Sequence, residues 1–194
     1  MSEQPKTDGR HRRGERSRQA ILDAACDMVA DGVLAPTAQE IAERAGVGIR
    51  TLFRQFEGMD DLYAAIEETK GPNNRARFTQ LDRHGSFEDR LLHAVEQRAI
   101  AYDELQNTLL FGQTQRWRSE VLRKSYVRSN HRLRKDLEDW LPELLKLPEQ
   151  SREAVDAVTS FEMWYRLREH QNMSTKAATA LVHALLSSLV VGLG

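Results

Sequence analysis

Apolar residues recur at three- and four-residue intervals along most of the chain, which is the spacing of one buried face of an α-helix. A first helix is expected to begin at Ser17, whose side chain can cap the first turn, and to end at Asp31-Gly32. No run of alternating β-branched residues indicates a sheet, and only five prolines interrupt the chain. The pattern therefore predicts an all-α protein of about nine helices.

Two short helices are predicted next, on either side of a glycine-containing turn. The first opens at Pro36-Thr37 and ends at Gly46, and the second covers Ile49–Phe56. The second helix is expected to place Leu52, Phe53 and Phe56 on one face.

Longer helices are predicted for the rest of the chain, where caps and breakers suggest the boundaries. The expected helices run from Asp60 to about Asn74, from Ser86 with a joint at Phe111-Gly112, from about Trp117 to Leu147, at about Ser151–Gln171, and from Ala177 to the end.

The most informative segment is the turn Gly46-Val47-Gly48 between the two short helices. A sharp turn of this kind needs a residue that tolerates positive φ, and glycine does so without steric cost. Such a helix-turn-helix places the start of its second helix in the major groove of DNA. Arginine can bind guanine there, glutamine can bind adenine, and isoleucine or a threonine methyl can touch thymine. The exposed residues of that helix are expected to be Ile49, Arg50, Thr51, Arg54 and Gln55.

Charge is balanced over the chain but concentrated locally. Lys and Arg number 28 against 29 Asp and Glu, which gives a net charge of −1. Attraction to nucleic acid must therefore come from a local basic patch. Residues 1–16 are expected to form a disordered basic arm that contacts phosphates. The basic residues in and beside this arm are Arg10, Arg12, Arg13, Arg16 and Arg18.

The segment from Ser17 to Leu62 resembles the DNA-binding domain of the TetR family of transcriptional regulators. The matching residues are Thr37, Ile41-Ala42, Ala45-Gly46-Val47, Thr51-Leu52-Phe53, Phe56 and Leu62, after a helix that contains Ile21-Leu22-Asp23-Ala24-Ala25. The resemblance implies a helix-turn-helix domain over residues 17–62 and an effector-binding and dimerisation domain over residues 63–194.

The resemblance also implies roles for single residues. Thr37 would contact phosphate, Gln39 would lie near a base, and Phe53 would lie against the DNA backbone. Three positions depart from the usual family pattern: Phe53 replaces a common Tyr, Gln55 stands where His or Tyr is frequent, and Met59 replaces a usual Lys. The departures at Phe53 and Met59 keep open the alternative of a helical protein-interaction module without DNA binding.

The last two predicted helices are apolar on more than one side, so each must be covered on more than one side. Either they are fully buried in a monomer, or they form the seam of a two-fold homodimer, as the resemblance implies. The residues expected at that interface are Val158, Tyr165, Leu181, Leu185 and Leu189.

An amphipathic effector, such as an acyl-CoA or a fatty acid, is the expected small-molecule partner. Residues from Trp164 to Ser174 loosely resemble the acyl-CoA-responsive actinobacterial type of TetR-like regulator. Tyr102, Phe111, Trp117 and Trp164 are candidates to line its apolar pocket. Its anionic head could meet Arg116, Arg123 or Arg128 of a basic helix, although a solvated charged face is the simpler interpretation.

Other chemistries find little support in the sequence. No catalytic constellation, metal site or cofactor site is predicted, so a helical-bundle enzyme is the weaker alternative. The apolar segment from Ala177 carries His183, Ser187 and Ser188 and is read as a buried helix, not a membrane anchor. A single cysteine, Cys26, fits a reducing cytoplasm. The expected protein is a cytoplasmic DNA-binding regulator of a palindromic operator, most simply a repressor.

Overall fold

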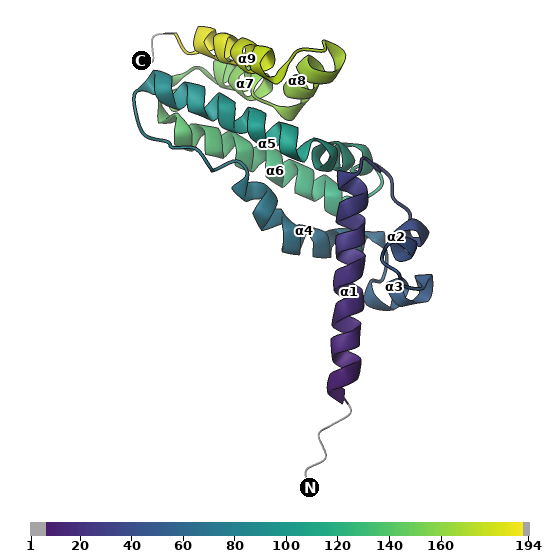
Figure 1. Cartoon of the computed structure of the whole chain (residues 1–194). Coiled ribbons are helices and arrows are strands. Elements are labelled where there is room, and N and C mark those ends of the chain that lie inside the picture. The colour runs from purple at the N-terminus through teal and green to yellow at the C-terminus, as the bar shows by residue number, and fades with distance from the viewer. Residues whose placement is uncertain (1–6, 192–194) are drawn as a thin grey trace. The chain divides into compact units, whose positions relative to one another are not determined.

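The computed structural model describes residues 7–191, and these residues are helical with no β-strand (Figure 1). The all-α prediction is confirmed. The described part of the chain contains nine α-helices and two short helical turns: α1 (Thr7–Ala30), α2 (Ala38–Arg44), α3 (Ile49–Gln55), α4 (Met59–Ala76), α5 (Phe87–Gln115), α6 (Glu120–Trp140), the 3₁₀ turn η1 (Pro142–Lys146), α7 (Glu149–Val158), α8 (Phe161–Tyr165), the π-helical turn η2 (Arg166–His170) and α9 (Thr175–Leu189).

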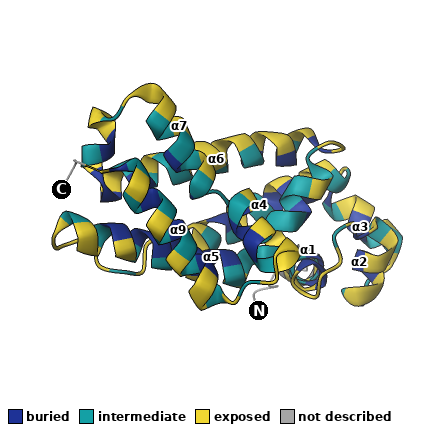
Figure 2. Ribbon diagram, turned by 90° about the horizontal axis from the view of Figure 1, so that it is seen from above, coloured by how far each residue is buried: buried dark blue, intermediate teal, exposed yellow. Residues whose placement is uncertain are grey.

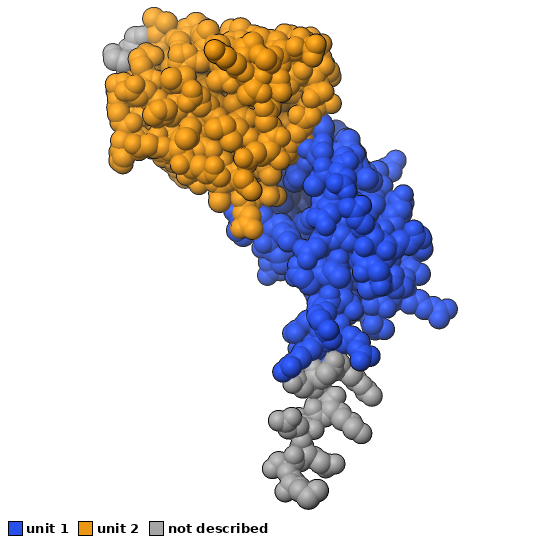
Figure 3. Space-filling view, viewed as in Figure 1, with its two compact units in different colours: residues 1–72, 107–126 blue, residues 73–106, 127–194 orange. Residues whose placement is uncertain are grey.

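The chain divides into two compact units (Figure 3). Unit 1 contains the residues up to 72 together with 107–126, and unit 2 contains 73–106 together with the residues from 127 onward. Helices α5 and α6 each contribute to both units. This geometric division differs from the boundary expected at residue 62, because the end of α5 and the start of α6 pack with the N-terminal helices.

The core of unit 1 forms where the apolar stripes of α1 to α4 meet. Ile21, Ile41, Leu52 and Leu62, one from each helix, have no exposed surface. Phe53 was expected on the same face as Leu52, but its side chain is 52% exposed. That expectation was wrong because Phe53 follows Leu52 by one residue, about 100° further around the helix.

A second cluster in unit 1 joins α4 to the ends of α5 and α6. The rings of Tyr63 and Phe111 pack edge to face with centroids 5.4 Å apart. Ser119 is buried, accepts a hydrogen bond from the Leu122 amide (3.2 Å) and donates one to Asp60 Oδ1 (2.5 Å). Ser119 therefore caps α6 and fixes the start of α6 to the first turn of α4.

Unit 2 is held together by buried polar groups as well as by apolar packing. Gln97 on α5 is 1% exposed, and its side chain satisfies three backbone groups of the preceding loop. Its Oε1 accepts from the amides of Gln80 (2.9 Å) and Leu81 (2.6 Å), and its Nε2 donates to the Arg77 carbonyl (2.6 Å). Arg90 makes a two-pronged ion pair with Glu143, which lowers the pKa of that carboxyl.

The structure corrects the expected start of the first helix. Residues 7–16 are helical and continue α1, so the part of the basic arm that is described is not disordered. Residues 1–6 of the arm lie outside the described residues.

Other boundaries also differ from the expected ones. Helix α4 continues through Pro72 to Ala76, and α5 continues through Gly112, where a joint was expected. The helix expected over 117–147 is α6 followed by η1. The helix expected over 151–171 breaks at Thr159-Ser160, because Ser160 caps a new helix by accepting a hydrogen bond from the Met163 amide (3.2 Å).

Candidate functional site

Helix α2 begins with a complete capping box. The hydroxyl of Thr37 accepts a hydrogen bond from the Glu40 amide (3.2 Å), and Glu40 Oε2 accepts from the Thr37 amide (2.8 Å). These contacts lower the pKa of the Glu40 carboxyl, chiefly through the backbone N–H of Thr37. The reciprocal bonds fix the N-terminus of α2, where Thr37 is expected to meet phosphate.

The turn between α2 and α3 has the backbone geometry that the sequence predicts. Gly46 has φ of 66°, in the left-handed region that glycine adopts most easily. The Val47 amide donates to the Ala42 carbonyl (3.0 Å), so the turn closes the end of α2. Gly48 has φ of −73° and is the residue that caps α3. Only the first glycine is therefore required by its φ.

Helix α3 buries one side and exposes a basic side. Leu52 is fully buried, whereas Arg50, Phe53 and Arg54 are exposed and Thr51 is half-buried. The helix contains no acidic residue. Ile49 was expected to be exposed, but it is half-buried and packs against the core of unit 1 because it lies three residues before Leu52 on the inner side.

Arg18 of α1 holds the C-terminal end of α3. Its Nη1 donates to the Gln55 carbonyl (2.8 Å), and its guanidinium lies 4.3 Å from the centroid of the Phe56 ring. The side chain of Gln55 is half-buried, and its Nε2 lies 3.7 Å from where a Cβ on Gly14 would be. Helix α1 thus positions Gln55 at the edge of the exposed face of α3.

The role of Arg18 was missed by the sequence prediction, which placed it in a phosphate-binding arm. A signal was present, because Arg18 precedes Ile21 and Leu22 by three and four residues and so lies on the buried side of α1. By contrast Arg12 and Arg13 are exposed, as phosphate contacts require. The side chain of Arg10 lies outside the described residues.

Gln39 on α2 and Met59 at the start of α4 are two further residues of unit 1 that the sequence analysis singled out. Gln39 is exposed, and its Nε2 donates to Glu43 Oε1 (2.6 Å). Met59, at the position where a family lysine is usual, is half-buried and packs against both core clusters of unit 1. Met59 therefore contributes packing where a lysine would contribute charge.

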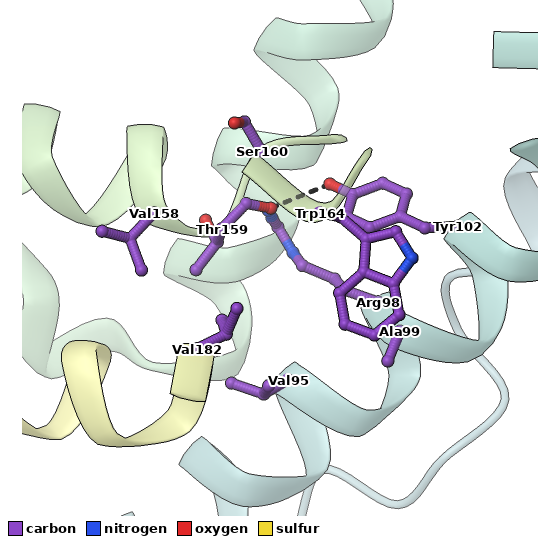
Figure 4. Close-up of a pocket in the computed structure, with 9 residues that line it drawn as sticks. All are labelled: Val95, Arg98, Ala99, Tyr102, Val158, Thr159, Ser160, Trp164 and Val182. Atoms are coloured by element: carbon purple, nitrogen blue, oxygen red, sulfur yellow. Dashed lines mark hydrogen bonds between the residues drawn. The ribbon is translucent and has the colours of Figure 1, made fainter. Parts of the chain in front are cut away.

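The four aromatic residues expected to line an effector pocket do not come together. Tyr102 and Trp164 line one cavity of unit 2, which Figure 4 shows together with Arg98 and Thr159. Phe111 belongs to the core of unit 1, and Trp117 is 79% exposed. The cavity as it stands has room for about one water molecule.

The basic residues expected to meet an effector head group are also not at this cavity. Arg116 stacks on the ring of Tyr126, with 4.1 Å between the guanidinium and the ring centroid. Arg123 is exposed and pairs with Glu120 one turn earlier, and Arg128 is exposed on α6. The simpler interpretation of this helix face, a solvated one, fits the structure better.

Helix α9 has two apolar faces with different burial (Figure 2). Ala178, Val182, Leu186 and Val190, spaced by four residues, are buried within unit 2. The five residues expected at a dimer interface all keep part of their surface exposed in the single chain. These half-buried residues are Val158, Tyr165, Leu181, Leu185 and Leu189.

The described residues contain no group of three or more His, Cys, Asp or Glu side chains that could hold a metal ion. None of the helices that the structure describes is long and apolar enough to cross a membrane. Burial raises the pKa of the Cys26 thiol on α1, so this thiol is less easily ionised than an exposed one.

Comparisons with known proteins agree with the geometry of unit 1. Residues 21–66 match the family described as bacterial regulatory proteins, tetR family. A transcriptional regulator from Rhodococcus sp. RHA1 has a similar crystal structure, with a TM-score of 0.66, 17% sequence identity and coverage of 92% of this chain and 96% of that one. A TetR transcriptional regulator from the same organism has a TM-score of 0.53, 17% identity and coverage of 93% and 99%. A comparison with curated proteins gives no significant match.

The similar structures show the fold, and the family match covers the helix-turn-helix. Both similar structures are those of transcriptional regulators. DNA-binding transcriptional regulation is the function that this family implies. The capped α2, the left-handed Gly46 and the exposed basic face of α3 agree with the match of residues 21–66 to that family.

Proposed function

We propose that the chain is a homodimeric, cytoplasmic repressor that leaves a palindromic operator when a small amphipathic effector binds. The observation that carries the proposal is the exposed face of α3, which is basic and free of acidic residues while Leu52 on the opposite face is fully buried. A helix held this firmly can enter a major groove without rearranging its own core.

Recognition of the DNA base sequence is assigned to four polar residues of α3. Arg50 and Arg54 can each bind guanine with two hydrogen bonds, and Thr51 and Gln55 can contact adjacent base edges. Thr37, Gln39 and Phe53 are assigned to the DNA backbone or its immediate vicinity, and Arg12 and Arg13 to phosphates. Ile49 is left out of this set because it packs inward.

Dimerisation is assigned to α9 together with the end of α7 and α8. Leu181, Leu185 and Leu189 follow one another at four-residue spacing and are half-buried, so they form a continuous apolar stripe. A second copy of this stripe would cover it, in the two-fold arrangement that most homodimers use. The half-buried state of all three leucines supports a helix–helix seam over a fully buried monomer helix.

Regulation is assigned to the cavity beside Tyr102 and Trp164. An effector would bind one arrangement of the dimer better than another and so shift the population of the two. In the arrangement without affinity for the operator, the two α3 helices would no longer match successive major grooves, which are about 34–36 Å apart. Support comes from the apolar walls of the cavity, which suit the body of an amphipathic molecule.

Selection of bound genomic DNA by the purified chain tests this proposal. The expected result is enrichment of palindromic fragments whose affinity falls steeply with salt. In Arg12→Ala and Arg13→Ala variants, affinity should fall alike on selected and random DNA, with a shallower salt dependence. Failure to enrich any fragment at low salt would favour a protein-interaction module.

A further inference from the structure

Arg98 is a buried cation that the proposed DNA-binding function does not use. It lies on α5, and only 6% of its surface is exposed. No Asp or Glu in the described part of the chain makes an ion pair with it. Instead its Nη1 donates to the Thr159 carbonyl (2.8 Å) and its Nη2 to the Leu133 carbonyl (2.5 Å). A full positive charge is therefore buried against neutral acceptors, which is a costly arrangement.

The acceptor at Thr159 is shared and lies at a structural break. Tyr102 Oη also donates to the Thr159 carbonyl (2.9 Å), as the dashed line in Figure 4 marks. Thr159 ends α7 and Ser160 begins α8, so the carbonyl belongs to a helix C-terminus that carries partial negative charge. Arg98 and Tyr102 thus act as two donors that fix the junction between α7 and α8 to α5.

The same residues border an apolar cavity. Arg98, Tyr102 and Thr159 line it together with Val95, Val158 and Val182 (Figure 4). The cavity holds about one water molecule, so a larger molecule must displace part of its wall. The α7–α8 junction is the part of that wall where the helix is interrupted, between Val158, the last residue of α7, and Phe161, the first residue of α8.

Asp156 is the acidic residue whose charge interacts with the charge of Arg98. Asp156 lies on the last turn of α7 and is half-buried, and burial raises the pKa of its carboxyl while the charges of Arg134 and Arg98 lower it. The Asp156 carboxylate interacts with the Arg98 guanidinium only at a distance greater than that of an ion pair. Arg98 therefore keeps the capacity to bind a carboxylate directly, with the short two-pronged geometry that guanidinium groups favour.

We propose that Arg98 binds the head group of the effector and that this head group is a free carboxylate on an apolar chain. The carboxylate replaces the carbonyl of Thr159 as the partner of Arg98, and the apolar chain lies among the valines of the cavity. The exchange removes one of the two hydrogen bonds that tie the α7–α8 junction to α5 and leaves the one from Tyr102. This inference rests on the proposed function for its regulatory meaning, but ligand binding itself can be measured without DNA.

A thioester of the same acid lacks the group that Arg98 would bind. Its acyl carbon carries a neutral carbonyl oxygen. This oxygen offers Arg98 the same kind of acceptor as the Thr159 carbonyl, without a negative charge. The inference therefore separates the two effector classes expected from the sequence and selects the free acid over acyl-CoA.

Calorimetric titration of the full chain, without DNA, tests the assignment. Hexanoate, decanoate and tetradecanoate are compared with decanol and with decanoyl-CoA. At least one alkanoate should bind, and decanol and the thioester should bind at least tenfold more weakly than decanoate. In Arg98→Met the alkanoate affinity should fall about tenfold to a hundredfold, with partial recovery in Arg98→Lys. The matched control is Arg123→Met, which removes an exposed arginine and should leave alkanoate binding unchanged.

Several outcomes would overturn the inference. These are no alkanoate binding to the natural chain, equal binding by Arg98→Met, or equal binding of acid and thioester. Decanol binding and the melting temperature of each variant show whether the cavity is still folded, and Tyr102→Phe provides a milder second variant. A chain that binds alkanoate through Arg98 but selects no DNA would refute the proposed function and leave this site intact.

Discussion

Helices α3 and α9 both bury one face and expose another, and the exposed faces differ in kind. The outer face of α3 presents Arg50, Phe53 and Arg54 to solvent. Beside its buried stripe, α9 presents the half-buried side chains of Leu181, Leu185 and Leu189. A charged face keeps its water until a polar partner such as DNA replaces it, whereas an apolar stripe gains free energy as soon as a matching apolar stripe covers it.

This contrast indicates that the two faces serve different partners. Binding through α3 should be sensitive to salt and to base sequence, because its contacts are charged and directional. Association through α9 should be nearly insensitive to salt and sensitive to the size and charge of its side chains.

The largest effect is expected from a charge placed on α9. Leu185→Arg or Leu189→Arg would put an unpaired cation in the apolar seam and weaken the dimer by about 3 kcal/mol or more. Analytical ultracentrifugation should show monomers at concentrations where the natural chain is dimeric. Leu145→Arg is the control, because Leu145 is an exposed leucine outside this seam. An unchanged dimer in both α9 variants would remove the assigned interface.

Substitutions on α3 should cost less but change specificity. Arg50→Ala or Arg54→Ala should each lose about 1–3 kcal/mol of binding free energy at the operator and relax base preference at one position. Competition binding against operator variants measures both quantities. Arg44→Ala is the control, because Arg44 is on α2 and is paired with Asp31 at 2.7 Å. Equal losses on operator and random DNA would reduce the α3 arginines to phosphate contacts.

The turn that orients α3 can be tested by a pair of matched substitutions. Gly46→Ala should lower the free energy of unfolding by about 1–2 kcal/mol, because φ of 66° is strained for any residue with a Cβ. Gly48→Ala should have a clearly smaller effect, since φ at Gly48 is −73°. Neither added Cβ meets a heavy atom within 4 Å, so crowding does not explain a difference. Urea unfolding followed by circular dichroism provides the comparison, and equal losses would refute the strain argument.

The smallest expected effect is a pH dependence in unit 2. The Arg90 guanidinium lowers the pKa of Glu143 below its ordinary 4.5, so the pair stabilises the fold above that pH and the contribution is lost as the pH falls through the lowered pKa. Arg90→Met should lose about 0.5–1 kcal/mol at pH 7 and show less further loss in acid. Thermal unfolding between pH 3 and 7 checks this.

The control for this pair lies in unit 1. Glu120 also has a lowered pKa because of Arg123, but both side chains are more than half exposed. Arg123→Met should therefore change the acid sensitivity less than Arg90→Met does. The reverse order would show that burial does not set the strength of these pairs.

The helix-turn-helix could be predicted from sequence because its signals are local. The cap Thr37 and its partner Glu40 are three residues apart, and the positive-φ residue Gly46 lies two residues after the end of α2. Short-range patterns of this kind determine local geometry with little help from the rest of the fold. The same reasoning misplaced Ile49 and Phe53, because a short helix leaves few residues to define its buried side.

The regulatory part could not be predicted in the same way because its contacts are distant in sequence. Arg98 and Thr159 are 61 residues apart, and nothing near either one indicates the other. Phe111 and Trp117 carry the same apolar signal as Tyr102, yet the chain places them in unit 1. Composition can name aromatic candidates for a cavity, but only packing decides which of them meet.

The proposed mode of DNA binding is best tested by the salt dependence of binding to a selected genomic fragment. Log affinity should fall linearly with log salt, with a slope of about −0.9 for each phosphate contacted, and the protected site should be a palindrome with half-sites about one helical turn apart. The slope should become less steep by about one in Arg12→Ala or Arg13→Ala. Binding that is independent of salt, or equal for the selected fragment and random DNA at every salt concentration, would contradict it.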